Sequence, residues 1–580
     1  ISDGGNGYGL EKTGSGSITL NGLNTYGGAT KLSGGTLYVG TLADGGTASS
    51  IGQSSSDAAN LVFAGGTLGY TGGSVTIDRN FQFADGSNNT IRVGNSATTL
   101  TLSGTSPSSG GALIKTGAGT LELTGQHNYS GLTNVAQGTL LISGAGTLTS
   151  TATAGTYDAR MLIGKGATLK FDTTANQTLS GVISGSGQLI KDGTSELTLN
   201  AYNTYSGGTT VDGGTLWLGK GGSVGTIRGT LTVNSGATVD YKTANTFGWV
   251  RGSSVNRLDI NGGTVGGADF GNHFWNSFKL EMDGGELILG GSRNEFHRPT
   301  ITVTDDASIK TYNDNGTAPF GMRDGQRTTV NVSSGKTLTI DAALTERYGK
   351  ASLDVKGAGT LELTNNGNKF TGNTRLLDTS TLLLSGTGRL AGTTSNIYRG
   401  RIHLASGTTL DVNSTATQQW DGVITGTGAF NIMDGVVDLG GKSTYSGDTR
   451  IFDGARLQIA RGGTNAEIRG NIQIDSGGTL RYFRGDTRAI KLDNTISGTG
   501  TLQFKGQPTR NTSSYQAYKS SEFSGNTEVL AGARLWLSHH EGVGTNGVIK
   551  VMDGATLSIA VGDGNTVLNN VEVQGTGWLE

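Results

Sequence analysis

A seven-residue frame returns six times along the chain and constrains the fold more than any other feature. Each copy begins with an aromatic residue, followed by Gly two residues later, Thr at four and an aliphatic residue at six. The aromatic residues, which we call the repeat anchors, are Tyr26, Tyr129, Tyr205, Phe370, Tyr445 and Phe523. An alternating strand pattern follows eleven or twelve residues after each anchor. Such a repeat indicates stacked structural units rather than a series of separate globular domains.

The spacing of the anchors gives the size of the repeating unit. Three of the gaps between successive anchors are 76, 75 and 78 residues. The gap of 165 residues is about two such units with one anchor lost, and the gap of 103 residues is one unit with a further coil. A unit of this size accommodates three coils of about 25 residues each.

The strands within a coil alternate between apolar and polar residues. In the segment Gly119–Thr124, Leu121 and Leu123 face one way while Thr120, Glu122 and Thr124 face the other. A strand this short cannot bury its face alone, whereas coils stacked about 4.8 Å apart share one continuous core. We therefore predict an all-β fold, a right-handed parallel β-helix (solenoid) of about 23 to 25 coils.

Composition and charge exclude several classes of protein. Gly accounts for 101 residues, Pro for only 4, and charged residues for 15%; disordered chains are richer in Pro and charge, whereas Gly supplies the positive φ angles of tight turns. The net charge of −2 lacks the basic surplus of a nucleic-acid binder. No apolar run approaches the roughly 18 residues of a membrane-spanning helix. The chain has no cysteine, which suits passage through a narrow pore while unfolded and is equally compatible with chance.

The most complete copy of the repeat resembles a known family. Its strings Leu-Ile-Lys-Asp-Gly at 189–193 and Tyr-Ser-Gly-Gly-Thr-Thr-Val at 205–211 closely resemble the passenger-associated repeat of autotransporters. The usual upstream partner of that repeat is present at 179–187, with echoes at 422–428 and 496–500. The resemblance implies a passenger that is exported through a C-terminal β-barrel translocator and is displayed on the outer face of the bacterial outer membrane or secreted. That barrel is not part of this sequence, and the repeat names no ligand.

The distribution of anchors suggests three regions. We expect repeat-rich β-helix at 1–240 and at 331–580, and irregular coils or a loop excursion at 241–330, where no anchor occurs. The chain opens at Ile1 without a signal-peptide pattern and ends at Glu580 in a strand-like pattern, so we interpret it as a fragment or a processed piece.

The sequence carries no catalytic signature. Gly-Asp-Ser-Gly, His-Glu-x-x-His and phosphate-loop motifs are absent. Asp305, Asp306 and Asp314 come nearest to a carboxylate cluster, but Asp is a common turn residue. The adjacent His539 and His540 would point to opposite faces of a strand, which argues against a metal site. We therefore predict that the chain is not an enzyme and uses no metal or cofactor.

Two stretches are candidates for ligand binding. The region 241–330 is unusually aromatic, and Trp249, Phe274 and Trp275 could present a sugar- or protein-binding surface; the alternative is that such residues fill wider coils of the core. The second stretch contains the tripeptide Arg484-Gly485-Asp486, which integrins recognise at an exposed loop tip, although a Gly-rich chain of this length can contain it by chance. The polar segment Gln507–Ser521 predicts a protruding loop.

These observations favour an adhesin that binds a host-cell or matrix protein or glycan, or that associates with copies of itself. The alternative is a structural stalk or extracellular filament without a ligand of its own. A carbohydrate-active β-helix enzyme would need clustered carboxylates on neighbouring coils, and a toxin would need an apolar segment able to insert into a membrane. We find neither, and we expect no nucleic-acid partner.

Overall fold

The computed structural model describes most of the chain. The described residues are 1–150, 153–266, 271–274, 278–312, 318–323, 325–392, 395–462, 466–486, 490–492, 494–507, 513–517, 522–538, 543–544, 546–560 and 569–580.

The chain is all-β and forms a parallel β-solenoid of about 24 turns, which confirms the fold class predicted from the repeat. A short 3₁₀ helix, η1 (Ala58–Asn60), interrupts the strands. The chain divides into two compact units. Unit 1 comprises Ile1–Glu281 with Gly285–Arg293, and unit 2 comprises Met282–Gly284 with Asn294–Glu580.

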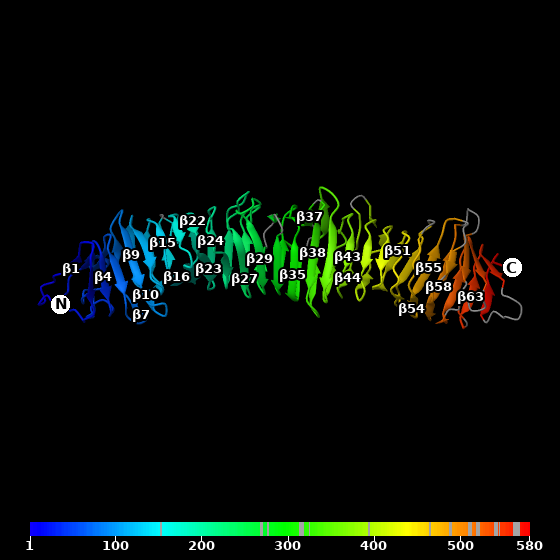
Figure 1. The fold of residues 1–580 in the computed structure, drawn as a ribbon, viewed down its shortest axis with the longest axis horizontal. Coiled ribbons are helices and arrows are strands. Elements are labelled where there is room, and N and C mark those ends of the chain that lie inside the picture. The colour runs from blue at the N-terminus through cyan, green and yellow to red at the C-terminus, as the bar shows by residue number, and fades with distance from the viewer. Residues whose placement is uncertain are drawn as a thin grey trace. The chain divides into compact units, whose positions relative to one another are not determined.

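In unit 1, strands of successive coils pair in parallel, so that each sheet is built from strands of neighbouring coils (Figure 1). One such sheet has eight strands: β2 (Ser17–Leu20), β4 (Thr36–Val39), β6 (Thr67–Tyr70), β9 (Asn88–Val93), β12 (Ala112–Thr116), β15 (Thr133–Val135), β19 (Met161–Ile163) and β22 (Ile183–Gly185). A second face of the same coils contains β10 (Thr99–Leu102), β13 (Thr120–Leu123), β16 (Thr139–Gly144), β20 (Thr168–Thr173) and β23 (Gln188–Asp192).

The register of this second face places like residues on top of one another. Leucines occupy the same position in five consecutive coils and are all fully buried: Leu100, Leu121, Leu140, Leu169 and Leu189. Stacked leucines form a continuous core, and burial of apolar area stabilises it by about 25 cal/mol per Å². The alternation seen in the sequence is therefore the alternation between core and solvent.

Unit 2 is built in the same way. Its nine-stranded sheet contains β45 (Ile397–Tyr398), β48 (Gln418–Trp420), β51 (Val436–Leu439), β53 (Arg456–Ile459), β55 (Thr479–Phe483), β58 (Thr501–Lys505), β61 (Asn526–Val529), β63 (Val548–Val551) and β65 (Asn570–Val573). A five-stranded sheet contains β56 (Ile490–Leu492), β59 (Ser513–Ala517), β62 (Ala533–Leu537), β64 (Thr556–Ile559) and β66 (Trp578–Leu579).

The six repeat anchors are buried, and the structure explains their frame. In four copies the anchor is Tyr and its hydroxyl shares a hydrogen bond with Oγ1 of the Thr four residues later, at 2.8 Å for Tyr129 and Thr133 and at 2.6 Å for Tyr205 and Thr209. Tyr26 and Tyr445 form the same bond. A Cβ on Gly207, in the middle of its frame, would collide with the Gly187 carbonyl of the preceding coil. The aromatic residue, Gly and Thr thus form one packed corner.

A second aromatic position, which the sequence did not reveal, completes this corner in two coils. The Tyr157 hydroxyl donates to the Gly131 carbonyl at 2.6 Å and contacts Thr133 Oγ1 at 2.7 Å. Tyr398 makes the equivalent bonds to the Gly372 carbonyl and to Thr374 Oγ1. Tyr398 therefore provides the hydroxyl that the anchor of its preceding coil, a Phe, lacks.

Three copies of the repeat also contain a lysine whose ammonium group is bonded to backbone carbonyls. Lys115 is fully buried and its Nζ donates to the carbonyls of Thr116, Gly117 and, one coil later, Gln137 at 2.8 to 3.1 Å. Lys12 and Lys191 make the equivalent three bonds. At this position in the later copies, the residues are Val355, Ile432 and Phe504. Burial lowers the pKa of Lys115 and of Lys191 to about 8.

The anchor hydroxyl predicts opposite effects of two reciprocal substitutions. Tyr445→Phe removes the bond to Thr449 Oγ1 and should lower the free energy of unfolding by about 1 kcal/mol. Phe523→Tyr should raise it by a similar amount, because Thr527 Oγ1 is buried and has no partner among the described residues. Urea unfolding followed by circular dichroism measures both. Equal midpoints for wild type and both variants would contradict this account of the corner.

The buried lysines predict a dependence of stability on pH. Below about pH 8 the folded chain must keep these ammonium groups charged in its core. Between about pH 8 and 10 they lose protons in the folded state while the unfolded chain, with the ordinary pKa of 10.5, still holds them, so stability should rise with pH. Burial also raises the pKa of tyrosines such as Tyr205 in the folded chain. Above about pH 10 the unfolded chain loses tyrosine protons that the folded chain keeps, so stability should then fall with pH. Lys191→Met should reduce the rise, whereas substitution of the exposed Lys165 by Met should leave it unchanged; equal slopes for the two variants would contradict the prediction.

Candidate functional site

A row of exposed apolar side chains lies on the outer face of the eight-stranded sheet in unit 1. Leu132, Leu162 and Val182 are 37%, 36% and 37% exposed and come from three consecutive coils. The register places Thr133, Met161 and Ile183 side by side, so Leu132, Arg160 and Val182 form one outward column, with Leu162 in the next column. We call Leu132, Leu162 and Val182 the apolar row. Outward positions of strands that cover a core are more often polar.

A shallow cavity of about 400 Å³ lies over Leu132 and Leu162 of this row. Its lining combines apolar and polar groups, from Ser130, Leu132, Ala159, Arg160, Leu162 and Ser184. An apolar surface bordered by polar groups marks an interaction site, and Arg is one of the residues that most often dominate the binding energy at such a site. The sequence contained this signal only as outward positions of strands occupied by Leu and Val.

The aromatic residues predicted to bind a ligand are distributed differently. Phe274 is 1% exposed and packs in the core between Phe247 and Phe278, with ring centroids 5.3 and 4.7 Å apart. This is the arrangement expected of residues that fill wider coils. Trp249 is half-buried, and its backbone amide donates to the Ser223 carbonyl. Trp275 lies outside the described residues.

In the tripeptide Arg484-Gly485-Asp486, the Arg and Asp side chains bind each other. The Arg484 guanidinium donates two hydrogen bonds of 2.7 Å to the Asp486 carboxylate, and the two side chains are only 9% and 19% exposed. The backbone amide of Arg484 donates to the hydroxyl of the buried Tyr515, and Gly485 lies against the Gly462 carbonyl. A receptor that reads Arg and Asp separately would first have to open this pair.

The prediction of a protruding loop at Gln507–Ser521 is wrong in part. Residues Ser513–Ala517 form β59, which pairs in parallel with β56 and β62. Tyr515 is buried there while its neighbours are polar, so the strand presents one core residue and its polar composition concealed it. Residues 508–512 and 518–521 lie outside the described residues.

The carboxylate and histidine candidates show no catalytic arrangement where they are described. Lys336 forms an ion pair with Asp305 and holds the pKa of that carboxyl below its usual range, while Asp306 accepts a hydrogen bond from the Thr337 amide. His127 is buried and stacks on Phe81, and burial lowers its pKa to about 3. Asp314, His539 and His540 lie outside the described residues. Within the described ranges, no group of three His, Asp or Glu residues could hold a metal ion.

None of the described residues belongs to a helix with the length and hydrophobicity that a membrane crossing needs.

Comparison with known proteins agrees with the repeat. The passenger-associated-transport-repeat family model matches residues 10–39, 113–142, 189–218 and 353–378. The first three matches contain the bonded lysines, and the fourth has Val355 in their place. The adhesin BmaC autotransporter of Brucella suis biovar 1 is 35% identical over 535 residues, which cover 86% of this chain but only 14% of that protein. No solved structure matches the chain. The repeats and this likeness together identify the chain as the repeat-bearing passenger of an autotransporter, a protein of the cell surface or one that is secreted.

Proposed function

We propose that this passenger acts in adhesion, by binding a protein or glycan of host cells or their matrix, or by associating with copies of itself. The observation that carries the proposal is the apolar row, whose exposed side chains come from three consecutive coils. The relative that matches most of this chain is named an adhesin, which supports the same reading. The chain spans 14% of that relative, so adhesion by the whole protein is part of the proposal.

The geometry of the row suits a protein surface as its partner. Leu132 and Val182 flank Arg160 in one outward column, and Leu162 lies in the next column, so together with Arg160 they form a short strip across three consecutive coils. Arg160 stands within this strip and can donate several hydrogen bonds to carbonyl or carboxylate groups of a partner. Because the backbone of the strip is fixed by the coils on either side, little conformational entropy is lost on binding.

The alternative is a stalk without a ligand of its own, and such a stalk would have no use for exposed Leu and Val side chains in a row. We also propose that the chain is not an enzyme, since the candidate carboxylates Asp305 and Asp306 are engaged in an ion pair and a backbone hydrogen bond. In the full-length protein, the partner that exports it would be a C-terminal β-barrel translocator, as in other autotransporters.

Adhesion is tested with beads coated with the chain and mixed with epithelial cells or with one another. Wild-type beads should bind cells or clump, and Leu132→Ser with Leu162→Ser should reduce this at least fivefold by removing the apolar strip. Both side chains point to solvent, so the double variant should remain folded. Beads that neither bind nor clump would instead support the stalk.

Two further variants locate the binding surface. Leu23→Ser is the matched control, because Leu23 is 65% exposed and lies elsewhere in unit 1, and it should leave binding unchanged. Asp486→Glu should also leave it unchanged, because the Arg484 and Asp486 side chains bond each other. Loss of binding with Asp486→Glu alone would move the site from the apolar row to the tripeptide.

A further inference from the structure

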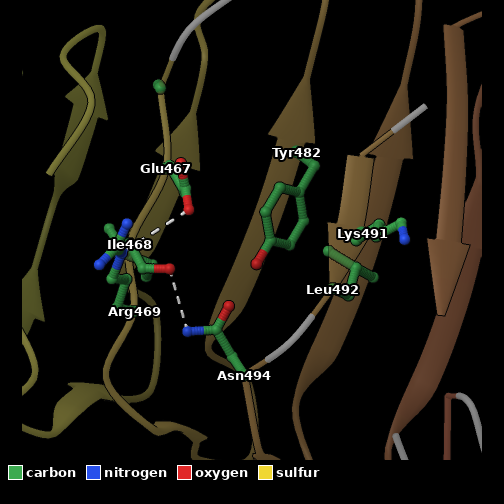
Figure 2. A pocket seen from close by; sticks show the side chains of 8 residues that line it. Glu467, Ile468, Arg469, Tyr482, Lys491, Leu492 and Asn494 are labelled. Carbon is green, nitrogen blue, oxygen red and sulfur yellow. Dashed lines mark hydrogen bonds and ion pairs between the residues drawn. The ribbon is translucent and has the colours of Figure 1, made fainter. Parts of the chain in front are cut away.

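A cavity in unit 2 opens into the core of the solenoid (Figure 2). Its volume is about 330 Å³, at the lower end for small-molecule sites, so it has room for one small molecule. It is lined by Ala466–Arg469, by Tyr482 of β55, by Lys491 and Leu492 of β56, and by Asn494.

Three of the lining residues belong to the core of the solenoid. Ile468, Tyr482 and Leu492 are 4%, 4% and 5% exposed, whereas the core neighbours Leu480 and Phe504 are completely buried. The ring of Tyr482 stacks on Phe504 with centroids 5.8 Å apart. The cavity therefore reaches the core and has apolar walls formed by Ile468 and Leu492.

Two polar groups face this space, the Tyr482 hydroxyl and the side-chain oxygen of Asn494. The Tyr482 hydroxyl is buried and has no hydrogen-bond partner among the described residues, and Figure 2 shows it pointing toward Asn494. Burial raises the pKa of Tyr482, so the hydroxyl stays protonated and able to donate. Asn494 uses its Nδ2 for the carbonyls of Ile468 and Gly470, at 3.1 and 2.6 Å, which turns its Oδ1 toward Tyr482 as an acceptor.

A hydroxyl group of a ligand satisfies both at once, since it can accept from Tyr482 and donate to Asn494. At the rim, the Glu467 carboxylate is within 3.0 Å of Lys442 and 3.8 Å of Arg469, so the acidic group is already neutralised. The Lys491 nitrogen points away from Tyr482 (Figure 2). Nothing in the cavity calls for a charged ligand.

We propose that this cavity binds a single uncharged sugar residue, the ring packing its C–H face on Ile468 and Leu492 while one hydroxyl bridges Tyr482 and Asn494. Such a site is independent of the apolar row in unit 1 and of adhesion, because a stalk could carry it as well. It goes beyond the proposed function by naming a ligand class and a position for it.

The test is direct binding of methyl glycosides of glucose, galactose, mannose and N-acetylglucosamine to the whole chain, by saturation-transfer NMR and titration calorimetry. At least one should bind, and glucuronate, which is charged, should bind more weakly. Tyr482→Phe should weaken binding about five- to tenfold, by loss of one hydrogen bond, without lowering thermal stability, because the hydroxyl has no partner to lose.

Tyr445→Phe is the matched control for that variant. It removes a hydroxyl that is bonded to Thr449, so it should lower stability and leave the affinity for the glycoside unchanged. Leu492→Trp, which fills the cavity, should abolish binding. The proposal is overturned if none of the four glycosides binds, if Tyr482→Phe binds as tightly as wild type, or if glucuronate binds at least as tightly as the neutral sugars. A negative bead assay would not contradict glycoside binding, because that measurement involves neither cells nor a second copy of the chain.

Discussion

Hydrogen bonding between the backbones of successive coils, in parallel and in register, is the interaction on which the rest of this structure depends. It satisfies the amides and carbonyls of strands only two to seven residues long, which could not be stable alone. It also aligns equivalent positions of successive coils, so that a leucine in one coil lies on a leucine in the next. The same stacking generates polar ladders outside the core. Glu122 accepts hydrogen bonds from Thr101 and Ser143, one coil before and one coil after it, each at 2.6 Å.

The repeat anchors follow from this constraint. Where the chain turns a corner, the preceding coil comes so close that only Gly fits, as at Gly207, and the aromatic ring beside it must bury its hydroxyl. The Thr four residues later shares a hydrogen bond with that hydroxyl and is the first residue of the next strand. An apparently loose sequence motif therefore describes one tightly packed corner, and its three residues depend on one another.

The sequence was sufficient to predict the fold and the repeat frame, because both depend on a pattern that occurs many times. It was not sufficient for features that occur outside the repeat frame. Tyr157 and Tyr398 complete the corner from the following coil, at a distance along the chain that no local motif marks. The buried role of Lys115 was missed because a lysine ordinarily indicates a solvent-facing position, whereas here three carbonyls surround its ammonium group. Residues 513–517 were predicted as loop because a strand with one core residue has almost no apolar signal.

The two candidate surfaces are both departures from the regular pattern. Leu132 and Leu162 place apolar side chains at outward positions, and Tyr482 places a hydroxyl in the core without the partner that the anchor tyrosines have. The turns of such a solenoid share the same core packing, so function is expected where a residue departs from that packing. The adhesin role proposed for this passenger and the sugar site proposed in unit 2 rest on such departures.

The most direct test of the account is a measurement of register between coils by disulfide trapping, since the chain has no native cysteine. Thr120 and Thr139 are half-buried on neighbouring strands and are paired in the register of β13 and β16. Paired strands place such residues about 4.8 Å apart, within the range that a disulfide spans. Thr120→Cys with Thr139→Cys should therefore crosslink on mild oxidation, and Thr120→Cys with Leu141→Cys should not. Crosslinking of the second pair in preference to the first would contradict the in-register stacking on which the account depends.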